Sequence, residues 1–303
     1  MFTGPFLKNL EIFKQINKSI ERLDAWVMLI GWAGFDPYDI KGTKLFVYLR
    51  RKASHPLKHQ RYLYRILFTL EKYFPLAMRI LFRMQKKVYA KGMGLFAKSY
   101  LYLSTTSKDM AFKQKAKQCL EWLVANQESG YGGSCWGYPF DWQTMVFIPR
   151  GTPSSVVSSV AGDAFWTAYK ILGDAKYLKI CESICEFFIK DLNIDNIDEK
   201  RICFSYTPID TFHVHNANLF VAEFLIRVGR EVKRDDFYNL GLRAANFSSA
   251  EQNPDGSIYY WGRIQNNYNP NHLDHYHSGF EIRMLHSIWI ISRDKRFKKS
   301  FES

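Results

Sequence analysis

Two kinds of helical hydrophobic pattern alternate from about residue 90 to the end of the chain. One pattern is amphipathic, and each copy opens with an equivalent aromatic residue. These aromatics are separated by 65, 60 and 60 residues and stand at Phe112, Tyr177, Phe237 and Phe297. The other pattern precedes each amphipathic one and is apolar on nearly every side, as expected of a buried helix. Its four copies lie near Gly94, Ala161, Asn218 and Gly279.

Short polar turns separate the two helices of each pair, and long loops rich in glycine and aromatic residues separate the pairs. The turns are Thr106–Lys108, Gly173–Asp174, Lys233–Asp235 and Arg293–Asp294. A repeated helix pair cannot bury its inner face alone and must stack on its neighbours. An open solenoid and a closed ring both satisfy this need, but loops of this length favour the ring because they can line a cavity mouth. We predict an all-α fold, an α/α toroid of helical hairpins of about 60 residues each.

The repeat does not extend into the first 60 residues. We therefore expect a basic N-terminal extension over residues 1–60 and the toroid over residues 61–303. The last amphipathic helix is cut short at Ser303. Either the natural chain continues or the ring is incomplete.

Charge is distributed unevenly along the chain. The net charge is +13, and residues 1–100 carry all of the excess, with 19 basic against 6 acidic side chains. A hydrophobic content of 47% excludes a disordered chain, and scattered glycine and proline exclude a collagen-like one. The basic third could bind an anionic polymer or an anionic membrane surface. We do not expect nucleic acid as a partner, because no recognised binding module is present.

Cysteine usage and hydropathy indicate the compartment. Five cysteines form no CxxC pair, and the odd count is not typical of a disulfide scaffold. Charged residues interrupt the apolar start of the chain, which therefore lacks the core of a signal peptide. No apolar run approaches the roughly 20 residues of a membrane span. These features predict a soluble, cytoplasmic protein.

Chemically active residues gather where each long loop enters the next buried helix. Thr152-Pro153 is typical of a helix start, so the free N–H groups of several helix N-termini should face one end of the ring, ready for an anionic or hydroxyl-rich ligand. Aromatic faces beside carboxylates and amides suit a sugar, although aromatic residues in a repeat protein also serve packing. The predicted substrate-binding residues are Trp136, Tyr138, Trp142, Tyr206 and Asn216, with Asp36 and Asp39 from an N-terminal Asp-Pro-Tyr-Asp turn.

The candidate catalytic residues lie in the same junctions. Asp141 would be the general acid or base of a glycoside reaction, Asp274 its partner, and His215 and His277 hydrogen-bonding groups. The spacing does not decide between inversion and retention. A lyase or epimerase would instead remove a proton with His215, His277 or Tyr206.

Cofactor and metal chemistry are not expected. His213, His215, Asp274, His275 and His277 have side chains that bind zinc, but no HExxH or similar spacing appears. The absence of GxGxxG, P-loop and GxSxG motifs argues against dinucleotide enzymes, kinases and serine hydrolases of that type. A terpenoid-type cyclase on the same architecture would need a DxDD motif, and the chain has none.

Several motifs resemble those of a known group of proteins. These are DPYD, KGMGLF at Lys91–Phe96, CWGYPFDWQ at Cys135–Gln143, TPSSVVSS, CFSYTP, VHNAN and the late HSGF. The chain resembles proteins encoded in exopolysaccharide and cell-surface glycan clusters, which are similar in fold to six-hairpin glycosidases. The resemblance covers nearly the whole chain and implies an α/α toroid that works in polysaccharide biosynthesis.

Two functions follow as hypotheses. The first is a carbohydrate-active enzyme, a glycoside hydrolase or a lyase, that acts on a surface polysaccharide or its precursor. The second is a non-catalytic protein that binds a poly- or oligosaccharide as part of an assembly machinery. Loss of turnover on substitution of Asp141 would distinguish the first from the second.

Overall fold

The computed structural model describes residues 4–53, 58–107, 110–264 and 271–303. Helices dominate the chain, and short strand pairs occupy two of the long loops. The helices after residue 89 are α5 (Ala90–Thr106), α6 (Met110–Ala125), α7 (Ser155–Leu172), α8 (Ala175–Asp191), α9 (His215–Val232), α10 (Asp235–Ala250), α11 (His275–Ser292) and α12 (Lys295–Glu302). The strands are β1 (Trp142–Gln143), β2 (Phe147–Ile148), β3 (Ile194–Asp198) and β4 (Arg201–Phe204), which form two antiparallel pairs.

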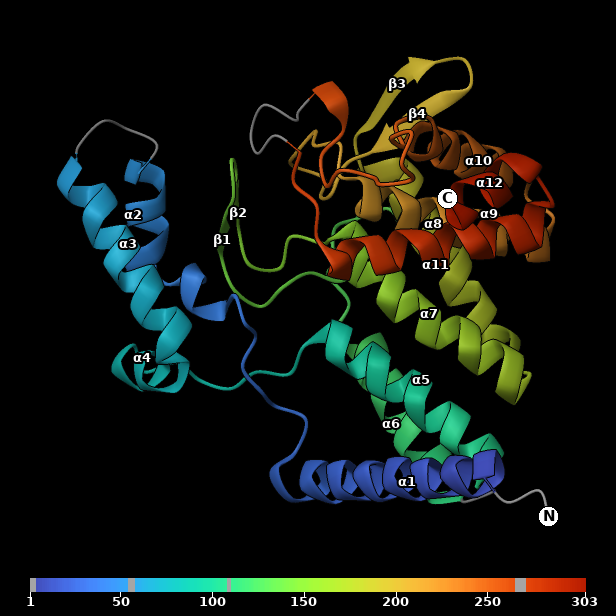
Figure 1. The fold of residues 1–303 in the computed structure, drawn as a ribbon, viewed down its shortest axis with the longest axis horizontal. Helices are drawn as coiled ribbons and strands as arrows, with labels where there is room; N and C mark the ends of the chain where they lie inside the picture. The colour runs from blue at the N-terminus through green and yellow to red at the C-terminus, as the bar shows by residue number, and fades with distance from the viewer. Residues whose placement is uncertain (1–3, 54–57, 108–109, 265–270) are drawn as a thin grey trace.

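The predicted helical hairpins are confirmed. Each amphipathic helix packs on the inner helix that precedes it, which pairs α5 with α6, α7 with α8, α9 with α10 and α11 with α12. Successive inner helices α5, α7, α9 and α11 also pack side by side in chain order (Figure 1). An inner layer of helices covered by an outer layer is the architecture of an α/α toroid.

Burial differs among the inner helices. Helices α7 and α9 are buried along nearly their whole length, because inner neighbours flank both of them. Helices α5 and α11 stand at the two ends of the series and bury fewer residues. The prediction of all-round burial is therefore confirmed for the two central inner helices alone.

The turns inside the hairpins lie where the sequence predicts them, although α10 begins after Arg234 without a side-chain cap. Helices α7, α9 and α11 each end in a left-handed residue, namely Gly173, Lys233 and Arg293. Asp174 then caps α8 by accepting a hydrogen bond of 3.0 Å from the Lys176 N–H. The residues of the first predicted turn lie partly outside the described residues.

The start of α7 corrects one expectation. Its N-cap is Ser154, whose hydroxyl accepts the Val157 N–H at 3.4 Å, and not Thr152. Thr152 and Pro153 remain in the loop, where Pro153 pairs with Gly137. A side chain on Gly137 would lie 2.3 Å from the Thr152 carbonyl oxygen, so only glycine permits this close approach of the two loop segments.

A charged network joins the four inner helices. Asp163 of α7 accepts hydrogen bonds from Lys98 of α5, at 3.0 Å, and from Arg227 of α9. Arg283 of α11 lies 3.8 Å from the same carboxylate, and Glu223 of α9 binds Arg227 at 3.1 Å. Residues from four hairpins thus converge on one half-buried carboxylate.

The N-terminal elements form two parts outside the hairpins. Helix α1 (Gly4–Ile30) packs across α5 and α6, where Asp24 accepts hydrogen bonds from Tyr100 and Lys115. The short helix η1 (Asp39–Gly42) and helices α2 (Lys44–Ala53), α3 (Lys58–Tyr73) and α4 (Pro75–Leu81) form a separate small cluster (Figure 1). We call this cluster the N-terminal unit.

The boundaries of the N-terminal unit refine the predicted organisation. Pro75 ends α3 and opens α4, as its position in the sequence predicts. The expected boundary at residue 60 falls near the start of α3, which packs with α2. The hairpins themselves begin at Ala90. Among the described residues, no helix is both long enough and apolar enough to cross a membrane.

Candidate active site

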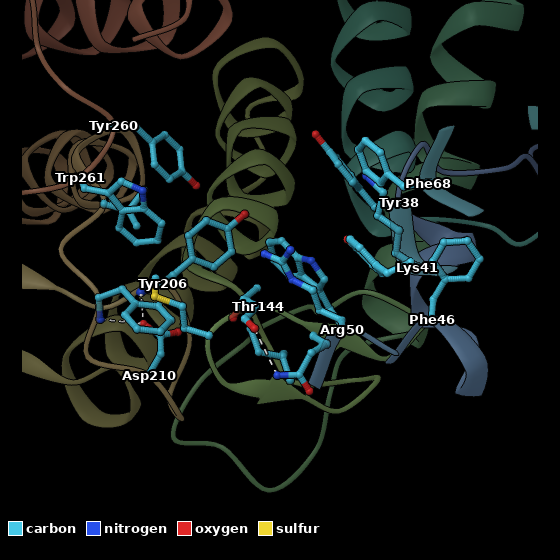
Figure 2. Close-up of a pocket in the computed structure, with 17 residues that line it drawn as sticks. Tyr38, Lys41, Phe46, Arg50, Phe68, Thr144, Tyr206, Asp210, Tyr260 and Trp261 are labelled. Atoms are coloured by element: carbon cyan, nitrogen blue, oxygen red, sulfur yellow. Dashed lines mark hydrogen bonds between the residues drawn. The ribbon is translucent and has the colours of Figure 1, made fainter. Parts of the chain in front are cut away.

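Two adjoining cavities lie where the long loops meet the starts of the inner helices. The inner cavity, of about 230 Å³, is lined from α7, α9 and α11 and includes Asn216 and His277. The outer cleft, of about 410 Å³, lies between those loops and the N-terminal unit (Figure 2). The two share four aromatic side chains and are therefore immediate neighbours. The shared residues are Tyr38, Trp142, Tyr206 and Tyr260.

Close contacts fix the N-terminal unit against the first long loop. A side chain on Gly42 would lie 2.4 Å from the Asp141 carbonyl oxygen, so glycine is needed there for the approach of η1. Arg51 of α2 donates a hydrogen bond of 2.7 Å to the Gln143 side chain of β1. Lys87 donates to the Pro139 carbonyl at 2.6 Å. These contacts hold Tyr38 over both cavities.

Asp36 and Asp39 hold the turn that carries Tyr38 and do not line either cavity. The Asp36 carboxylate accepts the Tyr38 N–H at 2.8 Å, and Asp39 forms a buried ion pair with Arg79 at 2.9 Å. Burial raises the pKa of Asp36. The structure places both carboxylates behind the aromatic wall, where they position Tyr38.

His277 and Asp274 form an oriented pair at the start of α11. Asp274 is the N-cap, and its carboxylate accepts the His277 N–H at 2.8 Å and lies 2.5 Å from His277 Nδ1. Burial alone would raise the pKa of Asp274, but the hydrogen bonds from His277 outweigh it and lower that pKa. An ionised carboxylate only accepts hydrogen bonds, so Nδ1 carries the proton. This arrangement leaves Nε2 of His277 for a ligand in the inner cavity.

Phenol groups line the inner cavity together with the histidine. The ring of Tyr260 lies 4.8 Å from the ring of His277, and the hydroxyls of Tyr138 and Ser154 hydrogen-bond to that of Tyr206. Burial raises the pKa of Tyr206 to about 12 and raises those of Tyr138 and Tyr260 as well. The three phenols therefore stay neutral at ordinary pH and act as hydrogen-bond donors or acceptors.

Asn216 offers an unused acceptor to the inner cavity. Its side chain lies in the first turn of α9 and is 5% exposed, and its Oδ1 has no hydrogen-bond partner among the described residues. A buried amide oxygen without a partner costs free energy, which a hydroxyl group of a ligand would offset. The position of Asn216 in the inner cavity therefore agrees with its prediction as a ligand-binding residue.

Two of the predicted catalytic residues lie elsewhere. The Asp141 carboxylate accepts the Arg150 N–H at 2.9 Å and closes its own loop. His215 uses both ring nitrogens, toward Ser248 and Glu251, each at 3.1 Å. Neither residue lines the inner cavity or the outer cleft.

Trp136 corrects the predicted sugar platform. It is 1% exposed, stacks on Phe165 and donates its indole N–H to the Leu123 carbonyl at 2.9 Å. A fully buried ring cannot contact a sugar. Tyr138, Trp142 and Tyr206, from the same predicted set, do line the inner cavity.

Sequence reasoning missed the contribution of the N-terminal unit. Tyr38, Lys41 and Arg50 line the outer cleft, although the repeat pattern gave no reason to place them there. Tyr260, one residue before Trp261 in the third loop, also lines both cavities. The Asp-Pro-Tyr-Asp motif was the available signal, with the tyrosine as its functional member. Among the described residues, no cluster of His, Cys, Asp or Glu has the arrangement of a metal site.

Comparison with known proteins identifies the fold. No protein-family model matches the chain, and no curated protein is similar to it in sequence. Solved structures are similar at low identity. A cellobiose 2-epimerase from Bacillus thermoamylovorans B4167 shares 12% identity over 89% of this chain and 74% of its own, with a TM-score of 0.52.

Two mannanases are also similar. An inactive variant of the alpha-1,6-mannanase GH76A of Salegentibacter sp. HEL1_6, in complex with alpha-1,6-mannotriose, shares 12% identity over 88% of this chain and 75% of its own, with a TM-score of 0.50. The GH76 alpha-mannanase BT2949 of Bacteroides thetaiotaomicron shares 13% identity over 70% of this chain, with a TM-score of 0.50. The chain spans 55% of the length of that enzyme. These likenesses show that the chain has the α/α toroid of six-hairpin glycosidase-like proteins.

Proposed function

We propose that the protein is a carbohydrate-active enzyme that binds a saccharide in the inner cavity and uses His277 as a general acid or base. The observation that carries this proposal is the His277 and Asp274 pair in a cavity lined by aromatic rings and an unpartnered amide oxygen. Sugars need flat apolar faces for their C–H groups and polar atoms for their hydroxyls. Solved structures of this fold include a cellobiose 2-epimerase and a mannanase with a bound mannotriose, which supports a saccharide as the ligand.

The reaction class that fits best is proton transfer at a carbon next to a carbonyl or carboxylate group, as in lyases and epimerases. Glycoside hydrolysis by two carboxylates needs an acid and a base or nucleophile on the two sides of the bond. Among the described residues, no Asp or Glu lines the inner cavity, and the Asp274 carboxylate is bonded to His277. A histidine held by a carboxylate is an ordinary proton-transfer group. Tyr206 and Tyr260 would donate hydrogen bonds to the oxygen that gains charge.

The resemblance of the sequence motifs to glycan-cluster proteins directs the choice of substrate. We propose a surface polysaccharide or its oligosaccharide precursor. The outer cleft lies beside the inner cavity, and the two together offer room for a saccharide of more than one residue.

The test measures proton exchange between the substrate and the solvent. The full chain is incubated in D₂O with neutral and acidic oligosaccharides, and mass spectrometry measures deuterium uptake and product formation. We expect turnover by the wild type and a loss of about 10²- to 10⁴-fold in His277→Asn. His286→Asn, an exposed histidine of the same helix, is the matched control and should retain activity.

Each other result has a defined meaning. Full turnover by His277→Asn would contradict the role of this residue, and loss of turnover in Asp141→Asn alone would restore the two-carboxylate hypothesis. Saccharide binding without deuterium uptake or product would favour the second candidate, a non-catalytic glycan-binding protein. The observation behind that candidate is that His277 is the one acid–base group other than lysine and tyrosine among the residues that line the inner cavity.

A further inference from the structure

The outer cleft contains basic side chains that the function proposed for the inner cavity does not use. Its walls are aromatic, and its charged lining residues are Lys41 of η1, Arg50 of α2 and Asp210 of the loop before α9. Figure 2 draws Tyr206, Tyr260 and Trp261 on one side and Tyr38, Phe68 and Lys41 on the other, with Arg50 between them. Both basic residues belong to the N-terminal third, where the excess positive charge of the chain lies.

The carboxylate of Asp210 is committed to its own loop. One oxygen accepts the N–H groups of Tyr206 and Phe212, at 3.1 and 3.0 Å. The other accepts the N–H and the hydroxyl of Thr207, at 2.7 and 2.5 Å. Four hydrogen bonds occupy the carboxylate, which is 2% exposed. Asp210 therefore shapes the cleft and is not available to pair with a cation across it.

Lys41 and Arg50 form no ion pair among the described residues. The ammonium group of Lys41 lies 4.4 Å from the centre of the Tyr38 ring and 5.0 Å from that of Phe68. The guanidinium group of Arg50 lies 5.6 Å from the centre of the Tyr64 ring. Burial lowers the pKa of Lys41, and the charge of Arg50 lowers it further, while Glu71 and Asp36 act in the opposite direction. An anion between the two cations would offset the cost of burying the Lys41 charge and reduce the repulsion between the two cations.

We propose that the substrate is an acidic saccharide whose anionic group binds between Lys41 and Arg50 in the outer cleft. The neighbouring sugar ring then occupies the inner cavity against Trp142 and Tyr206, because these side chains line both spaces. This inference rests on the proposed function and adds a substrate class to it. A carboxylate of a uronic acid and a phosphate on a sugar share the required chemistry.

The test compares pairs of ligands in which one member carries an anionic group and the other does not. Trigalacturonate and its methyl ester form one pair, mannose 6-phosphate and mannose a second, and isothermal titration calorimetry measures the dissociation constants. We expect the wild type to bind at least one acidic member more tightly than its neutral counterpart. Lys41→Gln and Arg50→Gln should each weaken that binding by about 10- to 100-fold. The binding of the neutral counterpart should stay within about twofold.

Lys44→Gln is the matched control. Lys44 lies on α2, is exposed and does not line the cleft, and its substitution removes the same charge. If it weakens acidic binding as much as Arg50→Gln does, the effect comes from the general positive field and the inference is wrong. Preference for the neutral ligands overturns the inference and leaves the proposed function intact. If none of the four ligands binds, the inference is contradicted, whereas the proposed function is judged by the separate deuterium-uptake test. Circular dichroism of each variant excludes unfolding as the cause.

Discussion

Glu281 is a buried acid one helical turn after His277. Its side chain is 2% exposed, and its Oε1 has no hydrogen-bond partner among the described residues. Burial raises the pKa of Glu281 to about 8, and the nearby charge of Asp274 adds to the shift. The folded protein therefore holds a proton on this group that the unfolded chain releases at lower pH. The free energy of unfolding therefore falls as the pH rises from the pKa of the unfolded group to that of the folded group.

Substitution of Glu281 should change how stability depends on pH. Relative to Glu281→Gln, the free energy of unfolding of the wild type should fall by about 1.4 kcal/mol per pH unit from about pH 5 to about pH 8. Urea denaturation at several pH values measures both proteins. A difference that stays constant over this range would show that Glu281 is not protonated in the folded state.

The sequence predicts which types of residue form the site better than it predicts where each of them lies. The sequence predicts Trp136 and Trp142 in one aromatic loop. In the structure the indole N–H of Trp136 donates to a backbone carbonyl in the core, whereas Trp142 lines the inner cavity. Likewise, His215 and His277 both open inner helices. Ser248 and Glu251 bond to both ring nitrogens of His215, whereas Asp274 bonds to Nδ1 of His277 and leaves Nε2 available. Ser248 and Glu251 lie 33 and 36 positions from His215, so no local pattern reveals these two partners.

At the scale of the helix, close packing of α7 depends on a residue without a side chain. A methyl group on Gly162 would lie 2.5 Å from the ring of Phe224 in α9 and 3.2 Å from Ile184 in α8. An aromatic ring in a packed interior has little room to move. The sequence predicted α7 and its neighbours from apolar periodicity, but not this contact between them.

The substitution Gly162→Ala should destabilise the protein. Overpacking costs about 1–3 kcal/mol and exceeds the gain of up to about 1 kcal/mol from the higher helix propensity of alanine. The control is Gly92→Ala in α5, where the nearest heavy atom lies 4.0 Å away and no loss is expected. Urea denaturation compares the two variants with the wild type. Equal stability of both variants would contradict the packing argument.

Caps were less predictable than helices. Both Thr152 and Ser154 have the side chain of an N-cap, and Pro153 favoured the earlier start. Tertiary structure decides, because Pro153 pairs with Gly137 in the preceding loop. By contrast, α7, α9 and α11 each end in a left-handed residue at the turn that the sequence pattern predicts.

For the whole molecule, Asp163 connects the hairpins. Burial alone would raise its pKa, but Arg227, Lys98 and Arg283 outweigh burial and lower it below the ordinary value of 3.8. The stabilisation it provides is present above that pH and is lost as the pH falls below it. Cations from three other inner helices surround this group, so its loss affects the whole series of hairpins.

Asp163→Asn should therefore lower the free energy of unfolding by about 3–5 kcal/mol at neutral pH, because three cations lose their shared carboxylate. Its deficit relative to the wild type should shrink below about pH 4. Glu231→Gln is the control, since it breaks the more exposed Lys170 pair between α7 and α9 and should cost at most about 1 kcal/mol. Thermal denaturation followed by circular dichroism measures both. Equal losses would show that the network is no stronger than a surface ion pair.

The overall architecture was predictable because each hairpin repeats the same local signals. The position of the N-terminal unit was not, because a few contacts such as Arg51 with Gln143 fix it, and these join residues 92 positions apart in the chain. Charge composition indicated that the first third is basic, but not that Lys41 and Arg50 face the same cleft as Tyr206.

Tyr38 belongs to a segment that is not part of any hairpin, yet it forms a wall of both cavities. The groups proposed for chemistry stand on α11 and α9, while much of the surface that would select a ligand stands on η1 and α2. Under the proposed function, selectivity and chemistry are encoded in separate stretches of the chain. Changes in residues 38–50 would then alter which sugar is accepted while the hairpins that position His277 stay as they are.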